Sequence, residues 1–216
     1  GFFSLSYAVS SIIFLFTGAM TPLFTRDFSK YWKIQDFVKM KNLYLKLIPP
    51  LVFLASFLSF FVVSNSEYLI IMIGGDQYEN AKFSLIIMAL YPIHQTYSQL
   101  CSGVLYSAGY TKLVRNISIP IDILGLIFTI FLILPTQYGG LELASTGLAL
   151  KMLTLQFIVV VFYIYYCSKI LSLSFKKSMI NQFLIIFILM IMAFSLNTLF
   201  NSILDQGLIK LLIHGI

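Results

Sequence analysis

The chain has 216 residues, of which 59% are hydrophobic, 16% aromatic and only 10% charged. A soluble domain carries about 25% charged residues because its surface must face water. The composition therefore argues against a soluble enzyme, a nucleic-acid-binding domain and a disordered linker, and the net charge of +6 has to be interpreted through membrane topology.

Six long stretches of the chain are free or almost free of charge. Uncharged runs cover 1–25, 47–66, 83–111, 123–141 and 178–204. One further run, 143–168, which is the fifth in chain order, is interrupted only by Lys151. A helix needs about 20 apolar residues to cross the hydrocarbon core of a bilayer. The sequence predicts an all-α fold, a polytopic transmembrane helical bundle with about six spans that forms one transmembrane domain over residues 1–216.

The positive charges are distributed unevenly between the connecting segments. Eleven of the 14 Lys and Arg residues fall in 26–46, 109–116 and 169–177, which follow the first, third and fifth runs. Cytoplasmic loops carry the excess of Lys and Arg. These three segments are therefore expected to be cytoplasmic loops of a multi-pass membrane protein, and a nucleic-acid partner is not needed to explain the basic balance.

This orientation places both ends of the chain outside. The first run has no charged n-region and no cleavage-site pattern, so 1–25 is not expected to be a signal peptide. Residues 207–216 resemble the start of a further span. We therefore interpret the sequence as a fragment, the C-terminal lobe of a longer transporter-like protein.

The sequence carries no pattern typical of an enzyme or a metal site. Cys101 and Cys167 are the only cysteines, with neither disulfide nor metal spacing, and are expected to fill space between helices. Asp122 and Lys151 are the only charged residues within spans. We expect no enzymatic activity, no cofactor and no metal.

The basic segment 28–46 also contains regularly spaced apolar residues. One interpretation is an amphipathic helix on the inner leaflet that attracts anionic membrane lipids. The other, which we favour, is a solvated positive-inside loop.

The third run is the least lipid-like. At 100° per residue, six polar or amphipathic side chains fall within an arc of about 140°. They are Tyr91, His94, Gln95, Ser98, Gln99 and Ser102. Lipid cannot satisfy such a stripe, so it points into the bundle or toward water. We expect a cavity that binds substrate through Tyr91, His94, Gln95, Ser98 and Gln99; hydrogen bonding between helices without a ligand is the alternative.

Lys151 lies about eight residues below the outer edge of its run. Placing a lysine near the bilayer centre costs about 2.5–3.5 kcal/mol on insertion scales, which argues for a function. We expect it to face the cavity and to offer a movable charge to a ligand there. Snorkelling toward the outer headgroups is the alternative.

Several short motifs follow one another along the chain: Pro22–Arg26, Ile73–Ala81, Tyr91–Gln95, Val104–Lys112 and Leu134–Gly147. Their order resembles that in a known family, the polysaccharide flippases for O-antigen and capsule within the multidrug/oligosaccharidyl-lipid/polysaccharide exporter superfamily. The resemblance covers about residues 15–150. It departs at Gly140–Ala144, where the family often has Gly-Ala-Ala, which puts a close backbone approach at 142–143 in doubt.

The resemblance implies a two-lobed bundle whose central cavity opens alternately to the two sides. It implies movement of an undecaprenyl-pyrophosphate-linked oligosaccharide from the inner to the outer leaflet of the bacterial cytoplasmic (inner) membrane for O-antigen or capsular polysaccharide biosynthesis. With this substrate, the ligand expected for Lys151 is the pyrophosphate. The expected partners are this lipid-linked oligosaccharide, membrane lipids and the polysaccharide polymerase machinery. The alternative function is an ion-coupled multidrug exporter of the same superfamily, for which Asp122 would be the sole intramembrane carboxylate.

Overall fold

The computed structural model describes the course of the chain over residues 1–205 and the side chains over 1–195 and at 198. Over these residues the chain is helical, without strands. Its elements are α1 (Phe2–Lys33), α2 (Phe37–Ser64), α3 (Ser66–Gly74), η1 (Asp76–Ala81), α4 (Lys82–Ser107), α5 (Thr111–Ile133), η2 (Thr136–Tyr138), α6 (Ala144–Ile170) and α7 (Phe175–Asp205). The further span expected at 207–216 lies outside the described residues.

Five of these helices, α1, α2, α5, α6 and α7, are long and apolar enough to cross a membrane. This supports the prediction of an all-α multi-pass membrane protein. The sixth long helix, α4, has 26 residues and coincides with the third run, but it is not among the five because polar side chains interrupt its apolar sequence.

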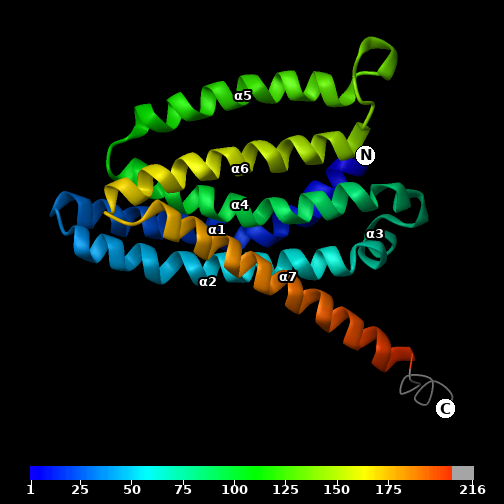
Figure 1. Ribbon diagram of the computed structural model, residues 1–216, viewed down its shortest axis with the longest axis horizontal. Helices are drawn as coiled ribbons and strands as arrows, with labels where there is room; N and C mark the ends of the chain where they lie inside the picture. The colour runs from blue at the N-terminus through cyan, green and yellow to red at the C-terminus, as the bar shows by residue number, and fades with distance from the viewer. Residues whose placement is uncertain (206–216) are drawn as a thin grey trace.

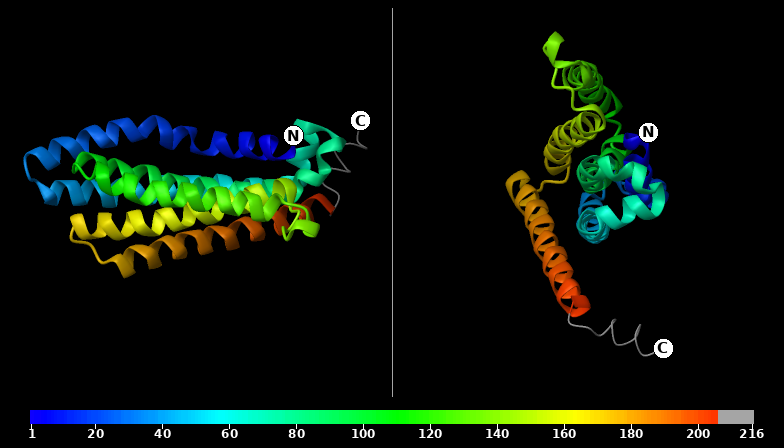
Figure 2. Two further views of the ribbon diagram at one scale, coloured as in Figure 1. Left: turned by 90° about the horizontal axis from the view of Figure 1, so that it is seen from above. Right: turned by 90° about the vertical axis from the view of Figure 1, so that its right-hand side faces the viewer.

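The polar helix α4 occupies the centre of the bundle. It packs against α1, α2 and α6, while α5 lies mainly on the far side of α6 (Figures 1 and 2). Helix α7 crosses α2 and α6 near its beginning and then diverges from the bundle (Figure 1). The polar helix α4 therefore lies inside and the apolar helices α5 and α7 lie outside, as expected when the surrounding solvent is lipid.

The three basic segments meet at one end of the bundle (Figure 1). The Lys41 ammonium donates to the Ser172 carbonyl over 3.5 Å, which joins the first segment to the third. The rings of Trp32 and Tyr110 pack edge to face with centroids 6.4 Å apart, which joins the first to the second. All three segments can thus face one side of a membrane, as the charge distribution predicts.

The segment 28–46 forms neither a separate amphipathic surface helix nor a solvated loop, the two possibilities considered from the sequence, but the ends of two long helices. Helix α1 continues to Lys33, and α2 begins at Phe37 after a three-residue turn. The Asp36 side chain caps α2 by accepting from the Lys39 backbone N–H over 3.0 Å. It also pairs with the Lys39 ammonium, and these two contacts hold the pKa of the Asp36 carboxyl below its usual range.

The loop between α5 and α6 folds back onto the end of α5. Backbone N–H groups of Leu141 and Leu143 donate to the carbonyls of Phe131 and Leu132, each over 2.9 Å. Such bonds satisfy carbonyls that the end of a helix leaves free. A Cβ atom at Gly140 would collide with the Leu134 carbonyl, so this position requires glycine. The backbone also approaches α5 closely at 142–143, where the Glu142 N–H donates to the Leu134 carbonyl over 3.1 Å beside the Leu143 bond.

Candidate functional site

Two sides of α4 are covered by neighbouring helices. Toward α1, the hydroxyls of Thr17 and Thr96 lie 3.3 Å apart. Toward α6, His94 packs edge to face on Phe157 with ring centroids 5.3 Å apart. The rest of the arc predicted from the sequence lies between these two contacts on the helical wheel.

Tyr91 is the member of the arc nearest to the beginning of α4. It belongs to a cluster with Met88 and Ala149, and its ring packs against Phe14 of α1. The Tyr91 hydroxyl donates to Gln95 Oε1 over 3.2 Å, one helical turn further along α4. Tyr91 therefore bridges α1, α4 and α6 and orients the first amide of the polar arc.

Two other members of the arc carry buried atoms without a partner. Neither His94 Nδ1 nor Gln99 Oε1 has a hydrogen bond within the described part of the chain. A buried polar atom that stays unpaired costs about 1–3 kcal/mol, so native proteins usually supply water or a ligand. These atoms can accept hydrogen bonds from hydroxyl groups. Ser98 and Gln95 are half-buried on the same side.

The structure adds Gln156 of α6 to these residues. Gln156 Nε2 is buried and unpartnered in the described region, and the residue follows Ala149 and Met152 on one stripe of α6. The contacts Ser84–Ser145 and His94–Phe157 show that α4 and α6 run parallel and place Gln156 level with the middle of the arc. Only an interrupted apolar stripe on α6 could have revealed it from the sequence.

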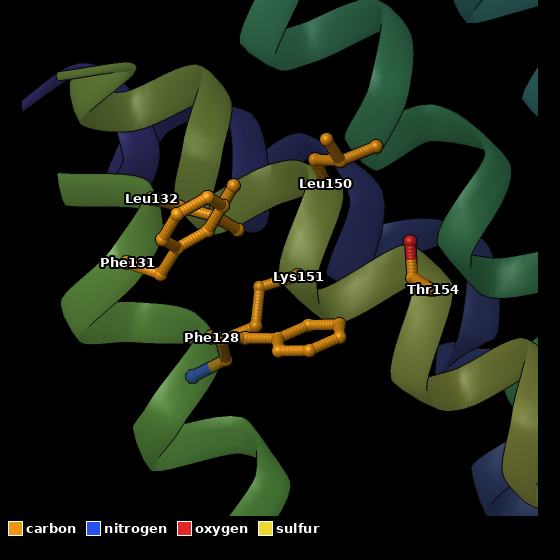
Figure 3. Close-up of a pocket in the computed structure, with 6 residues that line it drawn as sticks. All are labelled: Phe128, Phe131, Leu132, Leu150, Lys151 and Thr154. Atoms are coloured by element: carbon orange, nitrogen blue, oxygen red, sulfur yellow. The ribbon is translucent and has the colours of Figure 1, made fainter. Parts of the chain in front are cut away.

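Lys151 lies on another side of α6. Its ammonium donates to Thr129 Oγ1 of α5 over 3.0 Å. The hollow around it has a volume of about 170 Å³ and is lined by residues of α5 and α6 alone. These residues are Phe128, Phe131, Leu132, Leu150, Lys151 and Thr154 (Figure 3).

The expected cavity residues therefore fall into two groups. Tyr91, His94, Gln95, Ser98 and Gln99 form the polar face of α4, the name used below for these five side chains. Lys151 points away from it, toward α5, so the structure does not bring Lys151 and the polar face together. Neither the Lys151 hollow nor a second, entirely apolar one of about 480 Å³ on α7 is lined by the polar face. A substrate cavity at the polar face thus stays a prediction.

Asp122 is exposed on the surface of α5. The ion pairs found among the described residues are Arg26–Asp27, Lys39–Asp36 and Lys82–Glu67, and none of them involves Asp122 or Lys151. A carboxylate on an outlying helix, away from the centre of the bundle, is poorly placed to receive an organic cation.

The two cysteines are buried where α2, α4 and α6 meet. Cys167 Sγ donates to the Cys101 carbonyl over 3.3 Å, and the Tyr44 hydroxyl lies 3.6 Å from Cys101 Sγ. They belong to the main hydrophobic core, which fits the space-filling role expected of them. The described residues contain no group of three or more His, Cys, Asp or Glu side chains arranged to hold a metal ion.

Comparison with known proteins gives no match: the chain is similar to no known protein-family profile, no curated protein and no solved structure. The resemblance to polysaccharide flippases therefore rests on the sequence motifs alone.

Proposed function

We propose that this chain is part of a membrane flippase that moves an undecaprenyl-pyrophosphate-linked oligosaccharide from the inner to the outer leaflet. The observation that carries the proposal is the polar face of α4, a row of amide, hydroxyl and imidazole groups along the central helix. Buried acceptors without a partner among the described residues suit the hydroxyl groups of a sugar.

In this proposal the polar face holds the glycan while the lipid chain stays in the bilayer. Gln95 and Gln99 each offer an amide with two donors and one acceptor oxygen, and Tyr91 offers an aromatic ring beside them. Neutral groups of this kind bind and release a sugar without the strong desolvation cost of charged groups. A carrier needs such moderate affinity because it must release what it moves.

The test is translocation by the full-length protein in proteoliposomes. A fluorescent undecaprenyl-pyrophosphate oligosaccharide is loaded into one leaflet, and a membrane-impermeant glycosidase reports the fraction that reaches the other. We expect Gln95→Ala combined with Gln99→Ala to slow translocation at least about tenfold, since each lost neutral hydrogen bond is worth about 0.5–1.5 kcal/mol.

Gln137→Ala is the matched control, because it removes the same amide from the exposed loop after α5. It should translocate at the wild-type rate. Translocation that is equally fast in the double variant and the control would contradict the role of the polar face. Absence of glycan movement together with efflux of a lipophilic cation would favour the multidrug exporter instead.

A further inference from the structure

Helix α5 carries a carboxyl group at its midpoint. Asp122 is the twelfth of the 23 residues from Thr111 to Ile133, in a helix that is long and apolar enough to cross a membrane. At 1.5 Å per residue it lies about 16 Å along the helix axis from either end. The carboxyl group is therefore at the depth of the bilayer centre.

The Asp122 side chain is exposed on the surface of α5. Ile119 and Leu126, which flank it one turn before and one turn after, are exposed as well. A long lysine or arginine side chain can reach the headgroups from within a span, but aspartate is too short to do so from this depth. A charge on Asp122 would thus be surrounded by hydrocarbon.

No cation pairs with this carboxyl group within the described part of the chain. Arg115 lies two turns nearer the basic end, where its guanidinium donates to Asn116 Oδ1. The Lys151 ammonium of α6 donates to Thr129 Oγ1, two turns nearer the other end of α5. Seven residues, or about 10 Å of helix, separate Asp122 from each of these positions on α5.

Besides Lys151, the neighbouring helices contribute two tyrosines to this region. The Tyr163 hydroxyl of α6 lies 3.4 Å from Ser118 Oγ, one turn before Asp122, and Tyr106 of α4 lies near Tyr163. These hydroxyls are neutral and do not compensate a carboxylate. Asp122 is part of a polar stripe along the boundary of α5 with α6, within an arc of about 60° at 100° per residue. The stripe consists of Arg115, Ser118, Asp122 and Thr129.

We infer that Asp122 is a proton-binding site, whose carboxyl group holds a proton while this side of α5 lies in lipid and releases it where this side meets water or a cation. A charge without a partner costs so much in an apolar surrounding that the group usually becomes neutral instead. A metal ion would need several oxygen ligands. A proton needs a single carboxylate oxygen, which is what the site offers.

Proton exchange at Asp122 links the charge of α5 to its surroundings. With the proton bound, the exposed side of α5 is uncharged near the bilayer centre and suits lipid. Without the proton, the same side requires water or a cation. A movement of α5 between these surroundings during transport is therefore accompanied by binding or release of a proton. This last step rests on the proposed function, whereas the proton site itself does not.

The experiment compares two carbodiimides on the purified full-length protein in lipid vesicles at neutral pH, without any glycan lipid. A carbodiimide takes up the proton of a carboxylic acid on nitrogen while the carboxyl oxygen adds to its carbon. Dicyclohexylcarbodiimide dissolves in the hydrocarbon, whereas a carbodiimide with a quaternary ammonium group stays in water. We expect the first reagent to modify Asp122, as detected by peptide mass spectrometry, and the second to leave it unmodified. Asp122→Asn, which has the shape of the neutral acid, should lose the adduct.

Asp76→Asn is the matched control, because it removes the same group from the exposed turn η1. It should keep the adduct on Asp122 in full. Infrared difference spectra between wild type and Asp122→Asn should show the carbonyl band of a protonated acid at neutral pH. Absence of this band would overturn the inference, because Asp122 is then ionised, and so would modification of Asp122 by the charged reagent, because the residue then lies in water. Neither result bears on the flippase, since no glycan lipid is present.

Discussion

Helices α4 and α5 are consecutive and similar in length, but their surroundings differ. Helix α4 is surrounded by α1, α2 and α6 and carries polar groups along one side, whereas α5 contacts mainly α6 and presents apolar side chains to the bilayer. Leu100 in α4 is 1% exposed and Leu126 in α5 is 67% exposed. In a membrane, the helix that the protein shields from lipid is the one that can afford polar residues.

The strongest test of this contrast is a charge on the lipid-facing side of α5. Leu126→Lys should raise the apparent free energy of membrane insertion of α5 by about 2.5–3.5 kcal/mol, because a charge is poorly solvated near the bilayer centre. A translocon insertion assay measures this. Ile133→Lys, at the last residue of α5, is the control and should cost little, since a lysine there can snorkel. Equal costs would mean that Leu126 does not face lipid.

Truncation of the same residue type separates the two helices by packing. Leu100→Ala leaves a cavity in the core and should lower the free energy of unfolding by about 2 kcal/mol or more. Leu126→Ala should change it by less than about 0.5 kcal/mol, because lipid tails replace the lost contacts. Denaturant titration in mixed micelles gives both values. Similar losses in the two variants would contradict the central position of α4.

One glycine in each of the two helices lies at a contact with a neighbouring helix. A Cβ atom at Gly103 of α4 would lie 2.8 Å from Thr25 Oγ1 of α1. Gly103→Ala should therefore destabilise the protein by about 1–2 kcal/mol through overpacking. At Gly125 of α5 the neighbour is the end of the Leu155 side chain at 3.0 Å, which can turn away. A thermal melt should show the smaller shift for Gly125→Ala, and the reverse order would be inconsistent with a tight α1–α4 contact.

The smallest expected effect concerns the hydrogen bond between α1 and α4. Thr17→Val and Thr96→Val remove the two hydroxyls that lie 3.3 Å apart. A double-mutant cycle should give a coupling of about 0.6 kcal/mol, the average for such bonds in membranes. Coupling of zero would show that the two hydroxyls do not interact.

The helices follow closely from the sequence because the bilayer sets their length and excludes charge. Each of the six uncharged runs overlaps one of the six long helices, and the polar arc of the third run lies on the central helix α4. The agreement is poorest for α5 (Thr111–Ile133), which begins and ends well before its run, 123–141. The turn at 34–36 could not be foreseen, because the basic residues around it fit a surface helix or a loop equally well. Hydropathy and helical periodicity predict single helices but not the turns or contacts between them.

The position of Lys151 depends on contacts between helices, which no periodicity reveals. The sequence shows only the depth of this charge in its span, and that depth is compatible with a cavity shared with His94 and Gln95. The packing of Gly147 against Leu132 sets the register of α6 on α5 and directs the lysine to Thr129. Gln156 could not be predicted as a neighbour of the polar face for the same reason. The sequence shows a single amide within an apolar helix but not which helix that amide faces.

Thiol labelling in native membranes tests most directly whether the polar face of α4 borders a water-filled path. Single cysteines are placed in a full-length protein in which Cys101 and Cys167 are replaced by alanine. We predict that cysteines at positions 94, 95 and 98 react with a charged, membrane-impermeant maleimide, whereas those at 93 and 100 do not. A cysteine at 126 should react only with a lipid-soluble maleimide. Equal labelling of both sides of α4 by the charged reagent, or labelling of neither, would contradict the account.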